Sequence, residues 1–239
     1  MSYVPENAYD ARDMFAIDAA QAERAAFIRR TYLHLMGAIL ALIGLEVWFL
    51  NTPAIYEPLF NLIAGHWWLA LIAFAVTSWI AQSWAQNGAS PGAQYAGLAL
   101  YTLAEAVILC PLLFIISRFG DPNTIPMAGL LTGVIFVGLT ATVFITKADF
   151  PFLRGSLWVG LVVAIGTAVA GAIFGFSLGL AFVVPMIALL SGYILYDTSN
   201  VLHHYRTDQH VAASLALFSS VATLFWYVLR LLSLLSGRD

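Results

Sequence analysis

The sequence has one cysteine, few charges and no basic cluster, and each scarcity excludes a class of protein. With Cys110 the single cysteine among 239 residues, the chain can form neither an internal disulfide nor a cysteine-rich metal site. Charged residues make up 10% of the chain, whereas soluble domains carry about 25%. The 10 basic residues are scattered, so there is no basic field to bind nucleic acid.

Apolar residues make up 61% of the chain and gather into runs of membrane length. A hydrocarbon core of about 30 Å needs roughly 20 residues of helix, and seven segments satisfy this. They are residues 31–50, 66–85, 93–116, 126–146, 154–174, 178–197 and 212–236. Short links rich in Asn, Gly and Pro separate them, so we expect sequential helices to be antiparallel neighbours.

The sequence therefore predicts an all-α membrane protein with two parts, a polar tail over residues 1–30 and a seven-helix membrane domain over residues 31–239. The tail has no apolar core and is not a secretory signal. Its distal part, residues 19–30, is predicted to be helical and to lie at the interface. The lipid bilayer is the expected surroundings, and we expect no cofactor and no nucleic-acid partner.

Lys and Arg in short loops predict the orientation of the spans. One side holds Arg12, Arg24, Arg29, Arg30, Lys147, Arg154 and Arg206, and the other holds Arg118 and Arg238. The bias predicts a multi-pass protein of the cell inner (plasma) membrane with a cytoplasmic N-terminus. Seven crossings would put the C-terminus outside, whereas a half-spanning final helix around Arg230 would return it to the cytoplasm.

Ionisable groups inside the predicted spans are few, and such groups usually face a partner or a water-filled cavity. Glu105 falls near mid-membrane and Arg230 in the outer part, at about 1.5 Å per residue. Because an arginine in a membrane needs a carboxylate, Glu46 and Glu105 are both candidate partners of Arg230. A polar stripe at helical spacing accompanies Arg230, and it either forms interhelical hydrogen bonds or lines an aqueous or proton pathway. Its members are Ser220, Thr223, Tyr227, Arg230 and Ser233.

Asp197 ends the sixth span, and Asn200 and His204 follow it on the same helix face. If this helix continues toward Tyr205, Asp197 and Ser220 lie at the same depth on adjacent antiparallel helices. Asp197 is then buried opposite a hydroxyl. Burial disfavours the ionised form of a carboxylate, so the sequence predicts a pH-influenced acid. The alternative is that Asp197 stays ionised and caps a helix end at the interface.

The histidines and acids of the link between the last two spans do not form a convincing metal site. His203 and His204 are adjacent and point to different helix faces, and with Asp208 and His210 they are more simply a solvated loop. No paired nucleophile is present, so the sequence does not indicate an enzyme. Calcium prefers several oxygen ligands, which leaves Asp197 as a weak calcium candidate and no firm metal site.

One string resembles the signature of a known family. Residues 192–205, GYILYDTSNVLHHY, resemble the motif of the Bax inhibitor-1 family, and FVGLTATVFITKADFPFLRG at 136–155 and FWYVLRLLS in the last span are similar to other parts of its pattern. The compact length is similar to the bacterial branch. The resemblance implies a seven-helix bundle with the last helix central. It also implies association with pH-sensitive calcium leak or, in some bacterial members, modulation of a membrane-bound AAA+ protease.

In the calcium-leak members of this family, two aspartates on the last two long helices share a proton and close the pore. Asp197 matches the first, and the second falls on Ser220, so this chain lacks the pair. The first hypothesis is a pH-influenced cation leak channel that binds calcium transiently. Its pathway or gate would comprise Asp197, Ser220, Asn200, Glu105 and Arg230, with Glu46, Asp149 and His204 as supporting charges. The second is a non-channel regulator that binds an AAA+ quality-control protease through residues 1–28.

Overall fold

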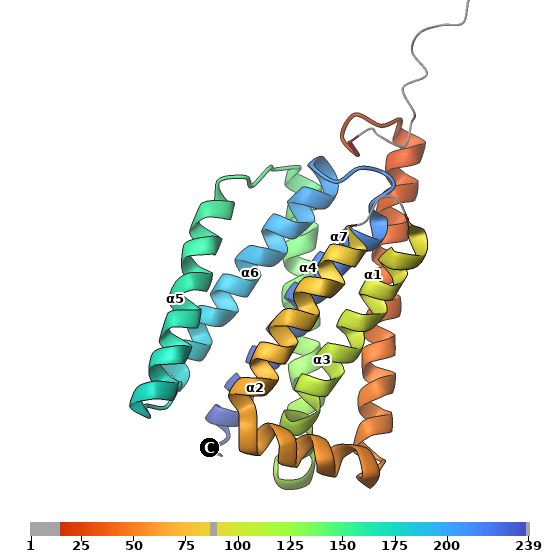
Figure 1. The fold of residues 1–239 in the computed structure, drawn as a ribbon. Helices are drawn as coiled ribbons and strands as arrows, with labels where there is room; N and C mark the ends of the chain where they lie inside the picture. Colours follow the sequence, from red (N-terminus) through yellow and green to blue (C-terminus); the bar gives the residue numbers. More distant parts are fainter. Residues whose placement is uncertain (1–14, 87–89, 238–239) are drawn as a thin grey trace, which may run out of the picture.

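The computed structural model describes residues 15–86 and 90–237, so Arg12, Arg238 and the start of the predicted turn at 87–92 lie outside the described residues. The chain forms seven helices (Figure 1). They are α1 (Gln21–Leu50), α2 (Pro53–Ala85), α3 (Pro91–Phe119), α4 (Thr124–Thr146), α5 (Leu153–Phe174), α6 (Leu180–His203) and α7 (His210–Leu235). Within these ranges the one β pairing is an isolated bridge between Phe15 and Arg206. The all-α prediction is confirmed.

Each helix contains a stretch long and apolar enough to cross a membrane, as predicted. The sequence predicted a link between the first span, which ends at residue 50, and the second, which begins at residue 66. That prediction was wrong, because helix α2 already begins at Pro53. Proline is tolerated in the first turn of a helix, where its missing N–H has no partner to lose. Backbone angles at His66 are non-helical (φ −142°, ψ 44°) and divide α2. Its first part lies across one end of the bundle, and its second part, Trp68–Ala85, is the candidate span (Figure 1).

The distal tail is helical as predicted, but it forms the first turns of α1 rather than a separate interfacial helix. Ahead of α1, the N–H of Ala16 donates to the carbonyl of Tyr205 at 2.9 Å, and Ala16 is fully buried. Arg24 Nη2 also donates to the carbonyl of Leu202 at 3.4 Å. The end of the bundle that holds these contacts is called the tail face below. It includes the α4–α5 loop and the α6–α7 link.

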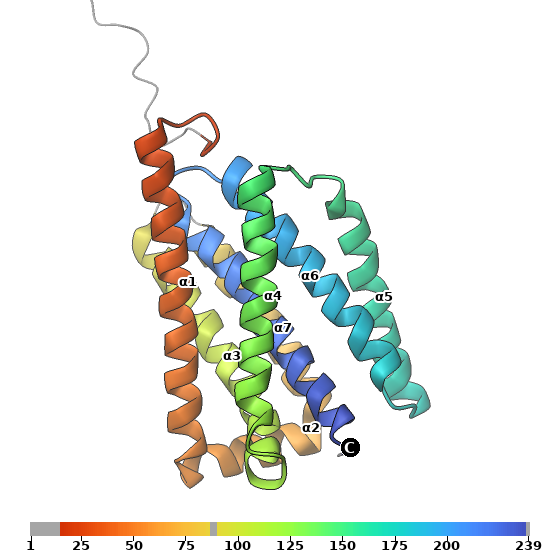
Figure 2. The ribbon, with the colours of Figure 1, turned by 180° about the vertical axis from the view of Figure 1, so that it is seen from behind.

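Helix α7 lies in the middle of the bundle, which confirms the prediction that the last helix is central. It packs against α1, α2, α3, α4 and α6, lying behind α2 and α3 in Figure 1 and behind α4 in Figure 2. Small residues such as Ala212, Ala213 and Ala222 are buried on it and let neighbouring helices approach closely. It runs from the end of the bundle that holds the start of α1 to the opposite end (Figure 1), and it is long and apolar enough to cross a membrane.

Helix α5 lies at the edge of the bundle and packs mainly on α6 rather than on α4. The expectation that all sequential helices are neighbours therefore fails here. Two glycines bring α5 and α6 together, because a Cβ at Gly160 would lie 2.6 Å from Leu189 Cδ1, and one at Gly192 would lie 2.9 Å from Leu157 Cδ2. The loop 147–152 bridges the wider gap between α4 and α5, and it begins at Lys147 with a positive φ of 52°.

Candidate functional site

The candidate site is built on a hydrogen bond between the last two helices. Ser220 Oγ on α7 donates to Asp197 Oδ2 on α6 at 2.6 Å. Ser220 is 7% exposed, and Asp197, which the sequence predicted to be buried, is partly buried. The link over residues 204–209 makes α6 and α7 antiparallel and sets this register. The predicted apposition of Asp197 and Ser220 is thus confirmed as geometry, while the role of the pair stays a prediction.

A tyrosine of the link also faces the carboxylate. Burial raises the pKa of the Tyr205 phenol, and the negative charge of Asp197 raises it further, so the two side chains lie within electrostatic range. Among the described residues, no Lys or Arg forms an ion pair with Asp197. Its one hydrogen-bond donor there is a neutral hydroxyl, which leaves the negative charge without a cationic partner.

The predicted pathway residue Asn200 lies just beyond Asp197, toward the tail face. It lines a pocket of about 540 Å³ together with Arg154, Tyr196, Tyr205 and other side chains of α5, α6 and the link. We call it the tail-face pocket. Because Tyr205 both lines this pocket and lies near Asp197, a route from the tail face to the carboxylate would pass this phenol.

Asp149 of the α4–α5 loop forms hydrogen bonds with residues at the C-terminal end of α6. Its Oδ1 accepts hydrogen bonds from Ser199 Oγ at 3.0 Å and from His204 Nε2 at 3.1 Å. The N–H of Phe150 donates to the same Ser199 Oγ at 3.1 Å. Desolvation raises the pKa of Asp149, but the hydrogen bonds from His204 and Ser199 outweigh it, so the pKa lies below its usual value. Asp149 and His204 were predicted only as supporting charges, and sequence reasoning missed Ser199.

Two glutamates are buried on the other side of α7. Glu46 on α1 and Glu105 on α3 are 5% and 4% exposed. Tyr101 lies one turn before Glu105 on α3, which packs against α1, and its Oη lies 2.9 Å from Ser219 Oγ on α7. The structure therefore brings Glu105 and Glu46 together near the central helix, and it separates both from Asp197 by the width of α7.

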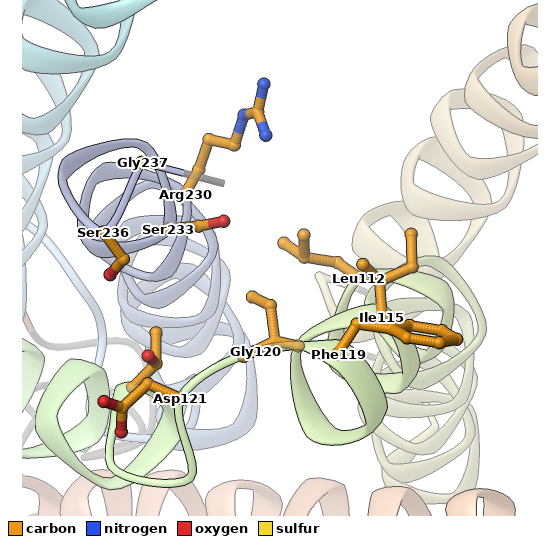
Figure 3. Close-up of a pocket in the computed structure, with 11 residues that line it drawn as sticks. Leu112, Ile115, Phe119, Gly120, Asp121, Arg230, Ser233, Ser236 and Gly237 are labelled. Atoms are coloured by element: carbon orange, nitrogen blue, oxygen red, sulfur yellow. The ribbon is translucent and has the colours of Figure 1, made fainter. Parts of the chain in front are cut away.

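Arg230 does not pair with either glutamate. It is half-buried and lines a pocket of about 580 Å³ at the opposite face, with Ser233, Asp121 and the apolar side chains of α3 (Figure 3). In Figure 3 its guanidinium points away from the Asp121 carboxylate. Within the described residues Arg230 forms no ion pair, so the predicted partnership with Glu46 or Glu105 was wrong for this part of the chain.

The polar side chains of the α7 stripe do not share one environment. Ser220 meets Asp197, Thr223 bonds back to the carbonyl of Ser219 at 2.8 Å, and the ring of Tyr227 contacts Phe182. The end of the stripe lines the pocket of Arg230. In the described chain, no group of three or more His, Cys, Asp or Glu side chains is arranged to hold a metal ion.

These observations define the class of protein. In the described part of the chain, six membrane-length helices surround or flank the central helix α7, and a carboxylate lies between α6 and α7. A family model described as "Inhibitor of apoptosis-promoting Bax1" matches residues 24–237. The chain belongs to this family, the Bax inhibitor-1 family, and is a multi-pass membrane protein.

Several curated relatives support the assignment. The chain is 29% identical over 230 residues to Bax inhibitor 1 of Schizosaccharomyces pombe, covering 93% of this chain and 81% of that protein. It is 34% identical over 133 residues to the Escherichia coli modulator of FtsH protease YccA, covering 55% of this chain and 60% of YccA. A Vibrio cholerae membrane protein is 31% identical over 119 residues, which is 49% of this chain and 53% of that relative. The names of these relatives describe an inhibitor, a modulator and a membrane protein, and none describes an enzyme.

Proposed function

We propose that the protein is a pH-influenced cation leak pathway, with calcium as the ion, and that the contact between Asp197 and Ser220 is its closed gate. The observation that carries this proposal is the 2.6 Å hydrogen bond from Ser220 Oγ to a carboxylate that has no cationic partner in the described chain. A proton on Asp197 would change the charge at this contact without requiring a second aspartate.

The positions of the two pockets support a route along α7. The tail-face pocket is lined by Asn200 and Tyr205, and Asn200 lies about one helical turn after Asp197 on α6. At the opposite face, the other pocket contains Arg230, about 15 Å further along α7 than Ser220 at 1.5 Å per residue. The gate therefore stands between two openings, and Glu105 lies beside the intervening part of α7 through Tyr101 and Ser219.

The few oxygen ligands at the gate favour transient binding of a passing calcium ion over tight binding. Calcium binds tightly through six to eight oxygens, and Asp197 with Ser220 and Asn200 supplies only part of that shell. Conduction requires binding that is weak enough for the ion to leave. We therefore expect transient calcium binding and no resident metal.

The first experiment is calcium flux into liposomes that contain the purified protein. We expect flux above that of protein-free liposomes of the same lipid composition. A matched control is a preparation of the protein inactivated by heat before reconstitution. Equal flux in all three preparations would contradict the conduction proposal.

A second candidate is a regulator of a membrane-bound AAA+ protease of the FtsH type. The similarity to a protein named as a modulator of FtsH protease favours it. We place the protein in the inner membrane with the N-terminus in the cytoplasm, where residues 1–28 would meet the protease. Residues 15–24 are tied to the α6–α7 link, so deletion of residues 1–14 alone is the milder variant. Protease association that survives both this deletion and deletion of residues 1–28 would contradict tail-mediated recruitment.

A further inference from the structure

A second acidic site lies in the middle of the bundle, away from Asp197. Both carboxylate oxygens of Glu46, and Oε2 of Glu105, are buried without a hydrogen-bond partner among the described residues. Buried polar groups are otherwise nearly always hydrogen bonded, and a bare ionised carboxylate in an apolar interior is very costly. Three unsatisfied oxygens on two neighbouring acids therefore point to a bound species that the protein chain itself does not provide.

The register of α1 against α3 puts the two acids at nearly one depth. His34 Nε2 on α1 lies 3.1 Å from Tyr95 Oη on α3, a sequence separation of 61. The two helices are parallel, so the same offset puts Glu46 level with Val107, two residues from Glu105. Both acids lie on the buried faces of their helices.

A free backbone acceptor lies at the same level. Pro111 is inside α3 and has no N–H, so the carbonyl of Val107 lacks the donor that residue 111 would normally provide. A carboxylate is only an acceptor, whereas a protonated carboxyl is also a donor. Within the described residues, the surroundings of Glu46 offer no hydrogen-bond donor to an ionised carboxylate.

The neighbouring helices provide no described cation to neutralise the pair. From α3, the titratable groups on the buried face beside Glu105 are Tyr101, one turn before it, and Cys110. From α7, the polar groups on this side are the hydroxyls of Ser219 and Thr223, which lie against Tyr101. Arg230 of α7 forms no ion pair with either acid in the described chain.

We propose that Glu46 and Glu105 form an intramembrane proton-binding pair that holds at least one proton at neutral pH. A proton fits better than calcium, because two carboxylates without a fuller set of oxygen ligands fall short of the six to eight that calcium requires. Two acids this close titrate as one coupled unit. The pair is separate from the gate at Asp197, and its existence does not depend on whether ions cross the protein.

Infrared spectroscopy of the lipid-reconstituted protein tests this proposal directly. A protonated carboxyl gives a carbonyl absorption that an ionised one does not, and labelling the glutamates with ¹³C shifts it only if glutamate carries it. We expect a ¹³C-glutamate-sensitive band at neutral pH that is lost at strongly alkaline pH. The band should be reduced in Glu46→Gln and in Glu105→Gln.

Asp197→Asn is the matched control and should leave the labelled band unchanged. A wild-type spectrum with every glutamate ionised at neutral pH would overturn the proposal, and so would a band that keeps its full intensity in both glutamine variants. The first of these outcomes is measured on the labelled wild-type protein alone, so the experiment can overturn the proposal even if a variant does not fold. Calcium flux is not measured in this experiment. A failure of the conduction proposal would therefore be detected separately, in the liposome flux experiment.

Discussion

Ser219 and Ser220 are consecutive on α7, yet they form hydrogen bonds on opposite sides of it. Ser219 Oγ lies 2.9 Å from Tyr101 Oη on α3, and Ser220 Oγ lies 2.6 Å from Asp197 Oδ2 on α6. Tyr101 in turn lies one turn before Glu105 on the buried face of α3. One turn of the central helix thus separates the two acidic sites and contacts both, so a shift of α7 would alter both together.

Loss of the Ser220 hydroxyl is expected to weaken the closed state. In Ser220→Ala, Asp197 loses its one described donor, and a hydrogen bond to a charged group is worth about 1.5–3 kcal/mol. We expect a lower thermal unfolding temperature in detergent and a higher calcium flux in liposomes. Ser219→Ala is the matched control, because its bond joins neutral groups and is worth about 1 kcal/mol. Equal effects of the two substitutions would contradict a special role for Ser220.

Ser220→Asp restores the pair of aspartates that the calcium-leak members of the family have. Two carboxyls in contact titrate with two macroscopic constants that belong to the pair. We expect calcium flux in this variant to depend more steeply on pH than in the wild type. Ser220→Asn, which has the same size without the acid, should not gain this steepness. Indistinguishable pH profiles of the two variants would show that the position of Ser220 does not participate in gating.

The Asp149 contacts predict how stability depends on pH. The pKa of Asp149 is lowered in the folded protein, so its contribution is fully present above the unfolded value of about 3.9. It is lost as the pH falls through the lower folded pKa. Asp149→Asn should therefore be less stable than the wild type at neutral pH and equally stable at strongly acidic pH. The side chain of Asp149 is 39% exposed, so the difference should be below about 1 kcal/mol.

Thermal unfolding of the wild type and Asp149→Asn across this pH range measures the effect. His204→Gln should show a smaller loss at neutral pH, because it removes one of the two side-chain donors to Asp149 and keeps Ser199. A stability difference that is the same at all pH values would mean that the Asp149 charge is not responsible.

Arg230 is expected to contribute little to folding, because it has no ion pair within the described chain. Arg230→Gln should change the free energy of unfolding by no more than about 0.5 kcal/mol, as for a substitution away from specific contacts. It should also raise cation flux, because it removes a positive charge from the pocket at the opposite face. A large loss of stability would reveal a carboxylate partner. Arg206→Gln, which breaks a 2.8 Å pair with Asp208, provides the comparison.

The sequence predicts local relationships well. Apolar length alone indicates the seven spans, and counting residues outward from the α6–α7 link predicts that Ser220 faces Asp197. That contact joins residues only 23 apart in one helical hairpin, so a short link fixes its register. The start of α2 was missed because Pro53, read as a turn residue, also suits the first turn of a helix.

Contacts between elements distant in the chain were beyond sequence reasoning. Ser199 and Asp149 are 50 residues apart, and Arg24 and Leu202 are 178 apart. Whether such distant residues come into contact depends on how α4, α5 and α6 are arranged around α7. The burial of Glu46 and Glu105 could be predicted, but their proximity to each other instead of to Arg230 could not. Which of these side chains lie close together depends on which helices are adjacent. The spacing of residues along one helix does not indicate this.

The central claim is that the charge state of Asp197 controls the pathway, and the pH profile of calcium flux tests it most directly. Wild type and Asp197→Asn should be reconstituted in identical liposomes and measured from mildly acidic to mildly basic pH. Because asparagine mimics the neutral acid at every pH, we predict a flat profile for Asp197→Asn at the acidic-limit flux of the wild type. The wild-type flux should change with pH. A pH dependence in Asp197→Asn equal to that of the wild type would contradict the account.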